Sequence, residues 1–236
     1  MKLISEISVF FPAYNEEENI AKTVASAVKI LEKIAGIYEV IVVDDGSKDR
    51  TSHIVKDLHS KNKRIRLVTQ TSNQGYGAAI RRGFAESRYA VICYTDSDGQ
   101  FDFEEIYNFI ELLKVGNDMV VGYRIKRTDN QYRRLMARVL HYVGIFLFGI
   151  NVKDVDCGFK VFKKDILKKI GPLKTASAIT ETEFVTRTIR AGFKISEAGV
   201  QHHSREGGEQ TGGKPSVIFR AAKEGISLWW TMLREK

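Results

Sequence analysis

Short β-rich runs alternate with amphipathic helical stretches from Ile7 to Tyr123, and this alternation limits the possible folds more than any other feature of the chain. Such a pattern is typical of βαβ units arranged around a mostly parallel sheet. We therefore expect an α/β fold with helices flanking the sheet. The expected strands cover 7–11, 39–43, 65–69, 90–95 and 118–122, and the expected helices cover 17–34, 49–60, 77–87 and 103–114.

The chain after Tyr123 is more irregular. The pattern there predicts a helix over 130–150, a strand over 160–162, a helix over 180–191, a strand over 194–200, a glycine-rich loop over 207–213 and a helix over 215–236. The first of these helices has Arg134, Arg138 and His141 in its basic half, while its other half is apolar all round. It is either buried against the sheet or lies in a membrane interface with its basic end at lipid phosphates.

The last predicted helix is amphipathic and basic. Its apolar stripe contains Ile218, Ala222, Ile226, Trp229 and Leu233, extended by Trp230 and Met232. Adjacent tryptophans on such a helix suit a membrane interface, and docking on the domain core is the alternative. No stretch approaches the roughly 18 uninterrupted apolar residues of a spanning helix. The first eleven residues read as a strand and not as a signal peptide.

The net charge of +8 is the one anomaly of the composition. A basic balance suits nucleic acid, an anionic membrane or phosphorylated small molecules. We exclude nucleic acid as a partner, because no basic sheet with interleaved aromatic residues and no nucleic-acid motif is present. The two cysteines, Cys93 and Cys157, lack C-x-x-C spacing and predict unpaired thiols in a cytosolic chain.

Two carboxylates, Asp96 and Asp98, follow the apolar run over 89–94. If that run is a buried strand, both emerge at its carboxyl end, where open α/β sheets bind their ligands. Oxygen ligands of this kind suit Mg²⁺ or Mn²⁺, which keeps several waters and bridges to substrate phosphates. The pair therefore predicts a metal ion that holds a diphosphate.

Other strand ends also gather polar residues. Asn15 is placed as an N-cap of the first helix, and Asp44 and Asp45 either form a turn or accept hydrogen bonds from a nucleobase or ribose. Gly75 and Gly77 permit close approach of the backbone to a ligand. No G-x-G-x-x-G or P-loop motif is present, which disfavours dinucleotide cofactors and P-loop chemistry.

Together these motifs resemble those of family 2 inverting glycosyltransferases of the GT-A fold, and within that family the dolichyl-phosphate mannose synthase and polyprenyl-phosphate glycosyltransferase group. The resemblance rests on Pro12-x-Tyr14-Asn15-Glu16, Val43-Asp44-Asp45-Gly46-Ser47-x-Asp49, Asn73-x-Gly75-x-Gly77, Asp96-x-Asp98-Gly99-Gln100, Gly122-Tyr123-Arg124, Asp154-Val155-x-x-Gly158-Phe159, Glu183 and Arg205-Glu206-x-Gly208. It implies a Rossmann-like sheet in a catalytic domain over 1–214, with a nucleotide-sugar half over 1–123 and an acceptor half over 124–214, followed by a C-terminal interfacial helix over 215–236.

The resemblance also implies roles for individual residues. The nucleotide sugar would contact Pro12, Tyr14, Glu16, Asp44, Asp45, Gly75, Asp96, Ser97 and Gln100. The metal ion would be held by Asp96, Asp98 and Gln100. The acceptor phosphate would meet Arg124, Arg133 and Arg205, whose guanidinium groups bind phosphate oxygens in pairs. The expected catalytic residues are Asp98, Arg124, Glu183 and Arg205. Two features differ from the group: Ala137 replaces a small hydroxyl residue, and the loop over 207–214 is longer.

The implied reaction moves mannose or glucose from GDP-mannose or UDP-glucose to a polyprenyl phosphate of the dolichyl type, with inversion. A metal ion at Asp96 or Asp98 would stabilise the leaving diphosphate. A lipid phosphate is already an anion and needs only positioning, whereas a sugar hydroxyl needs a general base. Glu183 is a candidate base, or it pairs with an arginine. The excess of arginine favours the phosphate acceptor.

Two other functions stay open at this point. One is a family 2 enzyme that acts on a glycan or polysaccharide hydroxyl. The other is a binding module without catalysis, against which the metal and phosphate residues argue. If the chain transfers sugar to a polyprenyl phosphate, we expect a peripheral protein on the cytoplasmic face of the membrane. His202 and His203 are expected to be structural, because adjacent residues on a strand point to opposite faces.

Overall fold

The computed structural model describes residues 2–125, 147–205, 207 and 215–235. The predicted helix over 130–150, with Arg133 and Ala137, lies outside these ranges except for its last four residues. Most of the glycine-rich loop over 207–213 also lies outside them.

The described part of the chain follows the predicted alternation closely. The strands are β1 (Ile4–Ala13), β2 (Ala35–Asp44), β3 (Ile65–Thr69), β4 (Val91–Tyr94), β5 (Met119–Arg124), β6 (Lys160–Lys163) and β7 (Ile195–Val200). The helices are α1 (Ile20–Ile34), α2 (Thr51–Lys61), α3 (Tyr76–Glu86), η1 (Phe103–Glu105), α4 (Ile106–Lys114), α6 (Asp165–Ile170), α7 (Ile179–Arg190) and α8 (Pro215–Arg234). The helix α6 was not predicted.

The strands form one seven-stranded sheet in the order β3-β2-β1-β4-β6-β5-β7. All neighbouring pairs are parallel except those of β6, which runs antiparallel to both β4 and β5. The predicted mostly parallel sheet is therefore confirmed. One consequence is that β6, from the later part of the chain, separates two strands that come from the first 124 residues.

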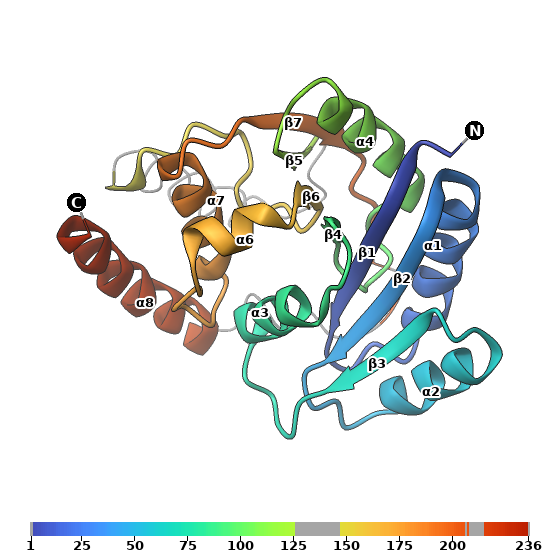
Figure 1. Ribbon diagram of the computed structural model, residues 1–236. Helices are drawn as coiled ribbons and strands as arrows, with labels where there is room; N and C mark the ends of the chain where they lie inside the picture. Colours follow the sequence, from blue (N-terminus) through green and yellow to red (C-terminus); the bar gives the residue numbers. More distant parts are fainter. Residues whose placement is uncertain (1, 126–146, 206, 208–214, 236) are drawn as a thin grey trace.

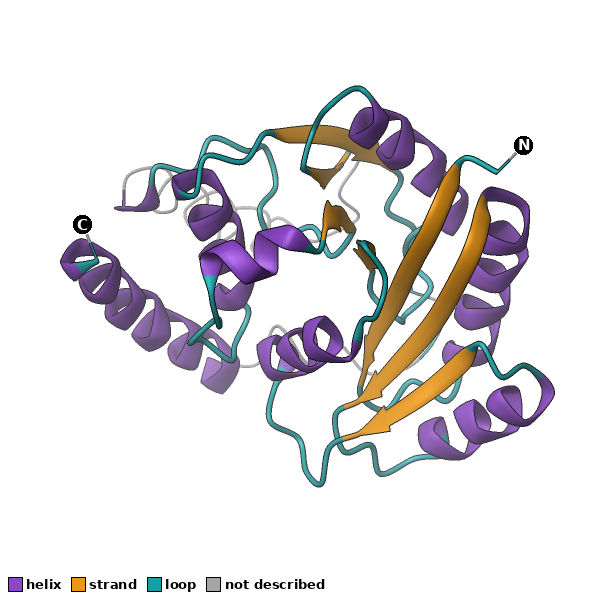
Figure 2. Ribbon diagram, viewed as in Figure 1, coloured by secondary structure: helices purple, strands orange, loops and turns teal. Residues whose placement is uncertain are grey.

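Helices cover both faces of the sheet (Figures 1 and 2). On one face α1 and α4 pack over side chains such as Val9 and Phe11, and on the other α3, α6 and α7 pack over Phe10. Successive residues of β1 point to opposite faces, so a strand buried on both sides reads as a continuous apolar run. This double burial holds the carboxyl ends of the strands in fixed positions.

The link between β1 and α1 differs from the prediction. The helix begins at Ile20, and Asn19 occupies the capping position instead of Asn15. Asn15 has a backbone φ of 55°, a left-handed conformation that asparagine tolerates. Its side chain accepts a hydrogen bond from the backbone N–H of Lys48 at 2.9 Å, and its own N–H donates to Ser47 Oγ at 2.9 Å. Asn15 therefore joins two loops and does not cap a helix.

The helix α8 presents two different apolar faces. Leu228 and Met232 are buried in the core on the α7 side, which confirms that the helix docks on the domain. Among the side chains of α8 described from residue 219 onward, the other face leaves four large apolar ones exposed: Phe219, Ile226, Trp230 and Leu233. The apolar stripe expected from the sequence is thus divided between the two faces. Among the helices in the described ranges, none is both long enough and apolar enough to cross a membrane.

Candidate active site

The carboxyl ends of β1, β2 and β4 meet at one edge of the sheet, and hydrogen bonds join the loops that follow them. Ser97 Oγ donates to the carbonyl oxygen of Pro12 at 2.7 Å, and the N–H of Asp45 donates to the carbonyl oxygen of Ala13 at 2.9 Å. These bonds bring three predicted site segments together. Tyr14, on the loop after β1, is half-buried beside them.

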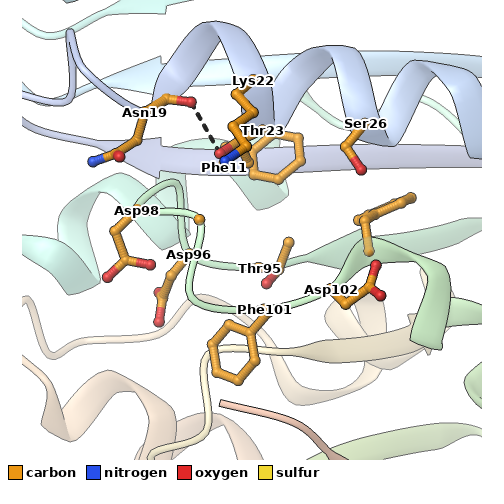
Figure 3. Close-up of a pocket in the computed structure, with 12 residues that line it drawn as sticks. Phe11, Asn19, Lys22, Thr23, Ser26, Thr95, Asp96, Asp98, Phe101 and Asp102 are labelled. Carbon is orange, nitrogen blue, oxygen red and sulfur yellow. Dashed lines mark hydrogen bonds between the residues drawn. The ribbon is translucent and has the colours of Figure 1, made fainter. Parts of the chain in front are cut away.

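The loop after β4 holds Asp96 and Asp98 at one end of a pocket of about 120 Å³ (Figure 3). The pocket lies between this loop and α1, with Asn19 and Thr23 on its helical side and Phe101 below. The hydroxyl of Thr95, which also lines the pocket, is buried and has no hydrogen-bond partner among the residues that the structure describes. The two carboxylates are therefore displayed at the mouth of a partly apolar recess.

Asp96 is held on both of its carboxylate oxygens. Its Oδ1 accepts a hydrogen bond from the hydroxyl of Tyr76 at 3.0 Å. Its carboxylate also lies close to Gly158: a Cβ added there would be 2.3 Å from Oδ2 and 2.5 Å from Oδ1, so a larger residue at this position would displace the Asp96 side chain. Burial, followed by the charge of Asp98, raises the pKa of Asp96 to about 6.

Arg205 bridges the other two acidic side chains of the site. Its Nη2 donates to Glu16 Oε1 at 2.8 Å, and its Nη1 lies 3.7 Å from Asp98 Oδ2. Burial is the largest cause of the raised pKa values of Glu16 and Asp98, and the charge of Arg205 opposes both shifts. The guanidinium thus partly neutralises a concentration of negative charge.

Gln100 fastens the segment that carries Arg205 to the loop after β4. Its side-chain Nε2 donates to the carbonyl oxygen of His203 at 2.8 Å, and the N–H of His203 donates back to the carbonyl oxygen of Gln100 at 2.8 Å. The ring of His202 packs edge-on against Phe101 at 5.3 Å between centroids. The ring contact supports the expected structural role of His202, while the role of the His203 side chain stays a prediction.

The residues present fit a divalent metal ion that completes its coordination with substrate. Asp96 and Asp98 offer hard oxygen ligands, and the side-chain amide nitrogen of Gln100 is engaged, which leaves its Oε1 as a ligand. Within the described ranges no group of three or more His, Cys, Asp or Glu side chains is arranged to hold a metal ion. Mg²⁺ and Mn²⁺ take the remaining ligands from water and phosphate oxygens.

Asp44 and Asp45, in contrast, are used by the protein itself. Asp45 accepts hydrogen bonds from the N–H groups of Gln74 and Gly75, both at 2.8 Å, and from Gln70 Nε2 at 2.7 Å. Asp44 accepts from the N–H of Ser47 at 2.9 Å and from the hydroxyl of Ser52. Both carboxylates are buried. Their direct contact with a nucleotide stays a prediction.

The glycines before α3 serve packing. Gly77 lies so close to α7 that an added Cβ would be 1.9 Å from Thr180 Oγ1 and 2.5 Å from the carbonyl oxygen of Ser177. Gly75 has a φ of 103°, and an added Cβ would lie 3.0 Å from the carbonyl oxygen of Ala176. The sequence suggested that these glycines allow close approach to a ligand. In the structure they allow close approach to the α7 region instead. A nucleotide contact at Gly75 stays a prediction.

Arg124, at the end of β5, forms a two-pronged ion pair with Asp154. Its Nε and Nη2 donate to the two carboxylate oxygens at 2.7 and 2.8 Å. Burial opposes the charge of Arg124, but the hydrogen bonds and charge of Asp154 outweigh burial and raise the pKa of the arginine. The charge of Arg124 in turn lowers the pKa of Asp96. Because β4 and β5 both run antiparallel to β6, Arg124 and the loop with Asp96 lie at the same edge of the sheet. Arg133 lies outside the described residues.

Glu183 does not join the gathered side chains. It is fully buried on α7, and its carboxylate accepts hydrogen bonds from the N–H groups of Lys174 and Thr175, the hydroxyl of Thr175 and Nε of Arg187, all within 3.0 Å. This environment supports the second interpretation of Glu183, in which it pairs with an arginine. The acid of α7 that points toward the site is Glu181, which was not predicted.

Comparison with known proteins places this geometry in a family context. The model described as Glycosyl transferase family 2 matches residues 8–171. A dolichyl-phosphate beta-glucosyltransferase of Saccharomyces cerevisiae is 31% identical over 85% of this chain and 68% of its own length. An undecaprenyl-phosphate 4-deoxy-4-formamido-L-arabinose transferase of Edwardsiella ictaluri is 28% identical over 92% of this chain and 66% of its own length. The chain thus spans about two thirds of these relatives.

A solved structure shows the same fold. Glucosyl-3-phosphoglycerate synthase of Mycobacterium tuberculosis, crystallised with Mn²⁺, uridine diphosphate and glucosyl-3-phosphoglycerate, superposes with a TM-score of 0.71. The match covers 96% of this chain and 79% of that protein at 18% identity. At this identity the likeness concerns the arrangement of the elements alone.

Proposed function

This chain belongs to glycosyl transferase family 2 and has the GT-A fold, and on that premise we propose that it transfers a hexose from a nucleoside-diphosphate sugar to a polyprenyl phosphate, with inversion. Relatives named as dolichyl-phosphate beta-glucosyltransferases support glucose over mannose, and therefore UDP-glucose over GDP-mannose as donor. Asp96, Asp98 and Oε1 of Gln100 would hold Mg²⁺ or Mn²⁺. The bound ion would supply positive charge to the leaving diphosphate.

The environment of Glu183 is the observation that supports a phosphate acceptor over a hydroxyl acceptor. A hydroxyl acceptor needs a base that can take its proton, and the carboxylate of Glu183 is fully buried and already accepts several hydrogen bonds. A phosphate acceptor arrives ionised and needs cationic side chains that orient it. Arg124 and Arg205 lie at the site edge and meet that need.

The side chains then divide the work as follows. Arg205 leaves its contacts with Glu16 and Asp98 to bind phosphate oxygens, because a phosphate group offers its guanidinium three acceptor oxygens. Arg124 stays oriented by Asp154. Its remaining N–H groups are directed to a second phosphate group of the bound substrates. Glu16 and Asn19 fix the loop over the nucleotide.

The exposed face of α8 supports attachment to the surface of a membrane. Phe219, Ile226 and Trp230 follow one another along this face with spacings of seven and four residues, and Lys223 and Arg234 flank them. Flotation with liposomes that contain anionic lipid tests this face. The double variant Ile226→Ser/Trp230→Ser should lose most of its binding, while Ser227→Ala on the same helix should bind like the unchanged protein. Equal flotation of both variants would remove α8 from the proposal.

The experiment that tests the function is a transfer assay with purified protein. UDP-glucose and GDP-mannose are offered separately, with dolichyl or undecaprenyl phosphate in detergent and with Mn²⁺, Mg²⁺ or EDTA. Asp98→Asn is the inactive variant, and Asp57→Asn, an exposed carboxylate on α2, is the matched control. We expect glucosyl lipid that requires the metal ion and is absent with Asp98→Asn.

Two results would change the proposal. Mannosyl lipid without glucosyl lipid would keep the reaction and correct the donor. Hydrolysis of the donor without any lipid product would move the acceptor to a hydroxyl group, and the search for a base would then begin with an acid that lies in the site, through Glu16→Gln.

A further inference from the structure

A buried ion pair lies beneath the candidate metal ligands. Lys160 Nζ is 2.6 Å from Glu181 Oε2, and the two side chains are 0% and 3% exposed. The lysine also donates to the carbonyl oxygen of Cys157 at 2.6 Å, and the hydroxyl of Tyr94 donates to Glu181 Oε2 at 2.5 Å. Replacing such a pair by apolar side chains is often neutral or stabilising, so stability alone does not explain its presence.

The hydroxyl of Tyr76 connects this ion pair to the site. It lies 3.2 Å from Glu181 Oε1 and 3.0 Å from Asp96 Oδ1. Tyr76 is the first residue of α3, Glu181 lies in α7, and Asp96 follows β4. Three elements that are distant in sequence therefore meet at one oxygen atom.

The contacts leave Asp96 little freedom. Tyr76 donates to one carboxylate oxygen, and Gly158 lies close to the whole carboxylate group. The position of Tyr76 is fixed in turn by Gly77, whose neighbour across the helix interface is Thr180, one residue before Glu181. The chain of contacts thus runs from the core of α7 to a single carboxylate.

We propose that Glu181 is a positioning residue: it shares the single hydroxyl proton of Tyr76 with Asp96, and it thereby fixes the hydroxyl that orients the carboxylate of Asp96 toward the donor's metal ion. Lys160 holds the carboxylate of Glu181 in place through the ion pair. The inference rests on the proposed function, because it takes Asp96 as a ligand of that ion. Partners that orient a metal ligand typically change metal affinity by about ten- to a hundredfold when they are removed.

The test measures binding of Mn²⁺ to the full chain in the presence of UDP, by calorimetry or electron paramagnetic resonance, without turnover. Tyr76→Phe removes the connecting hydroxyl and should weaken Mn²⁺ binding at least about tenfold. Tyr94→Phe removes a hydroxyl that contacts the same glutamate but does not contact Asp96, and it should weaken binding less than about threefold. A comparison of these two variants separates an effect on the orientation of Asp96 from a general disturbance of the Lys160–Glu181 ion pair.

Glu181 is tested without leaving an unpaired buried charge. The double variant Lys160→Met/Glu181→Gln removes both charges and keeps the volume, so the core keeps its packing. It should bind Mn²⁺ as weakly as Tyr76→Phe, and adding Tyr76→Phe to it should cause little further loss, since both changes interrupt one path. Thermal unfolding of each variant shows whether it is folded.

The outcomes distinguish this inference from the proposed function. If the unchanged protein binds Mn²⁺ and transfers sugar while Tyr76→Phe and the double variant bind Mn²⁺ equally well, Glu181 and Tyr76 are structural and only this inference fails. If the unchanged protein binds no Mn²⁺ with UDP or GDP present, both proposals fail.

Discussion

Two pairs of carboxylates follow buried parallel strands, and the structure uses them differently. Asp44 and Asp45, after β2, are 1% and 3% exposed and accept hydrogen bonds from the N–H groups and hydroxyls of nearby loops. Asp96 and Asp98, after β4, receive few protein donors and lie at the mouth of a pocket. The supply of donors around a carboxylate therefore decides whether it holds the backbone or is left for a ligand. The number of acidic residues does not decide it.

The largest effect is expected at the second pair. Asp98→Asn should lower the rate of transfer by about a thousandfold, because the variant loses the negative charge that binds the metal ion. Its urea midpoint should not fall below that of the unchanged protein, since burial raises the pKa of Asp98 and its ionised form therefore does not stabilise the fold. A variant that keeps a tenth of the activity, or that unfolds readily, would place Asp98 with the structural pair.

The first pair should show the opposite behaviour. Asp45→Ala leaves the N–H groups of Gln74 and Gly75 without their acceptor, and the expected loss in the free energy of unfolding is about 3 kcal/mol. Urea unfolding measures this loss, with Asp57→Asn as the control. If the variant is as stable as the unchanged protein but fails to bind the nucleotide, then Asp45 is a ligand-binding residue and the comparison between the pairs is wrong.

The pH dependence of stability sharpens the contrast. Burial and the charge of Asp98 raise the pKa of Asp96 to about 6, from 3.8 for an ordinary aspartate. A carboxyl whose pKa is higher in the folded chain destabilises the fold when it ionises. This penalty is absent below about pH 4, grows between pH 4 and 6, and is complete above pH 6.

Asp96→Asn should therefore stabilise the metal-free protein at pH 8, on the order of 2 kcal/mol, and have little effect at pH 4. Urea unfolding in EDTA at the two pH values measures the difference, and the slope of the transition should stay the same. A gain that is equal at both pH values would show that the charge of Asp96 is not the cause.

The smallest effect is expected at Ser52, which donates to Asp44. Ser52→Ala should cost about 1 kcal/mol, because Asp44 keeps its hydrogen bond from the N–H of Ser47. The KM for the donor sugar should not change. A several-fold rise in this KM, measured beside Ser60→Ala on the same helix, would indicate that Asp44 also contacts the nucleotide.

Much of the fold could be predicted from the sequence, because strands buried on both faces of the sheet appear as continuous apolar runs. The strands of the first 124 residues and the convergence of their carboxyl ends could be predicted from apolar runs and their spacing. The direction of β6 could not, since an apolar strand reads the same whichever way its neighbours run. The helix α6 could not be predicted either, because it has six residues, three of them polar, and is too short to show a helical pattern.

Individual side chains were harder to assign. Glu181 and Glu183 are two residues apart on one helix, so they point to different sides, and the sequence did not show which side faces the site. The glycines before α3 suggested a ligand site, but they pack against the α7 region. Close approach to a ligand and close approach to a helix both need a residue without a Cβ, so the sequence does not distinguish them. Such assignments depend on contacts between distant segments, which local patterns do not contain.

The order in which the strands are synthesised differs from their order in the sheet. During synthesis, β4 and β5 leave the ribosome long before β6, the strand that lies between them and pairs with both. Until residue 163 emerges, each keeps an open hydrogen-bonding edge, and open edges recruit other chains. We therefore expect a nascent chain halted near residue 125 to need chaperones, and the complete sheet to close late and in one step.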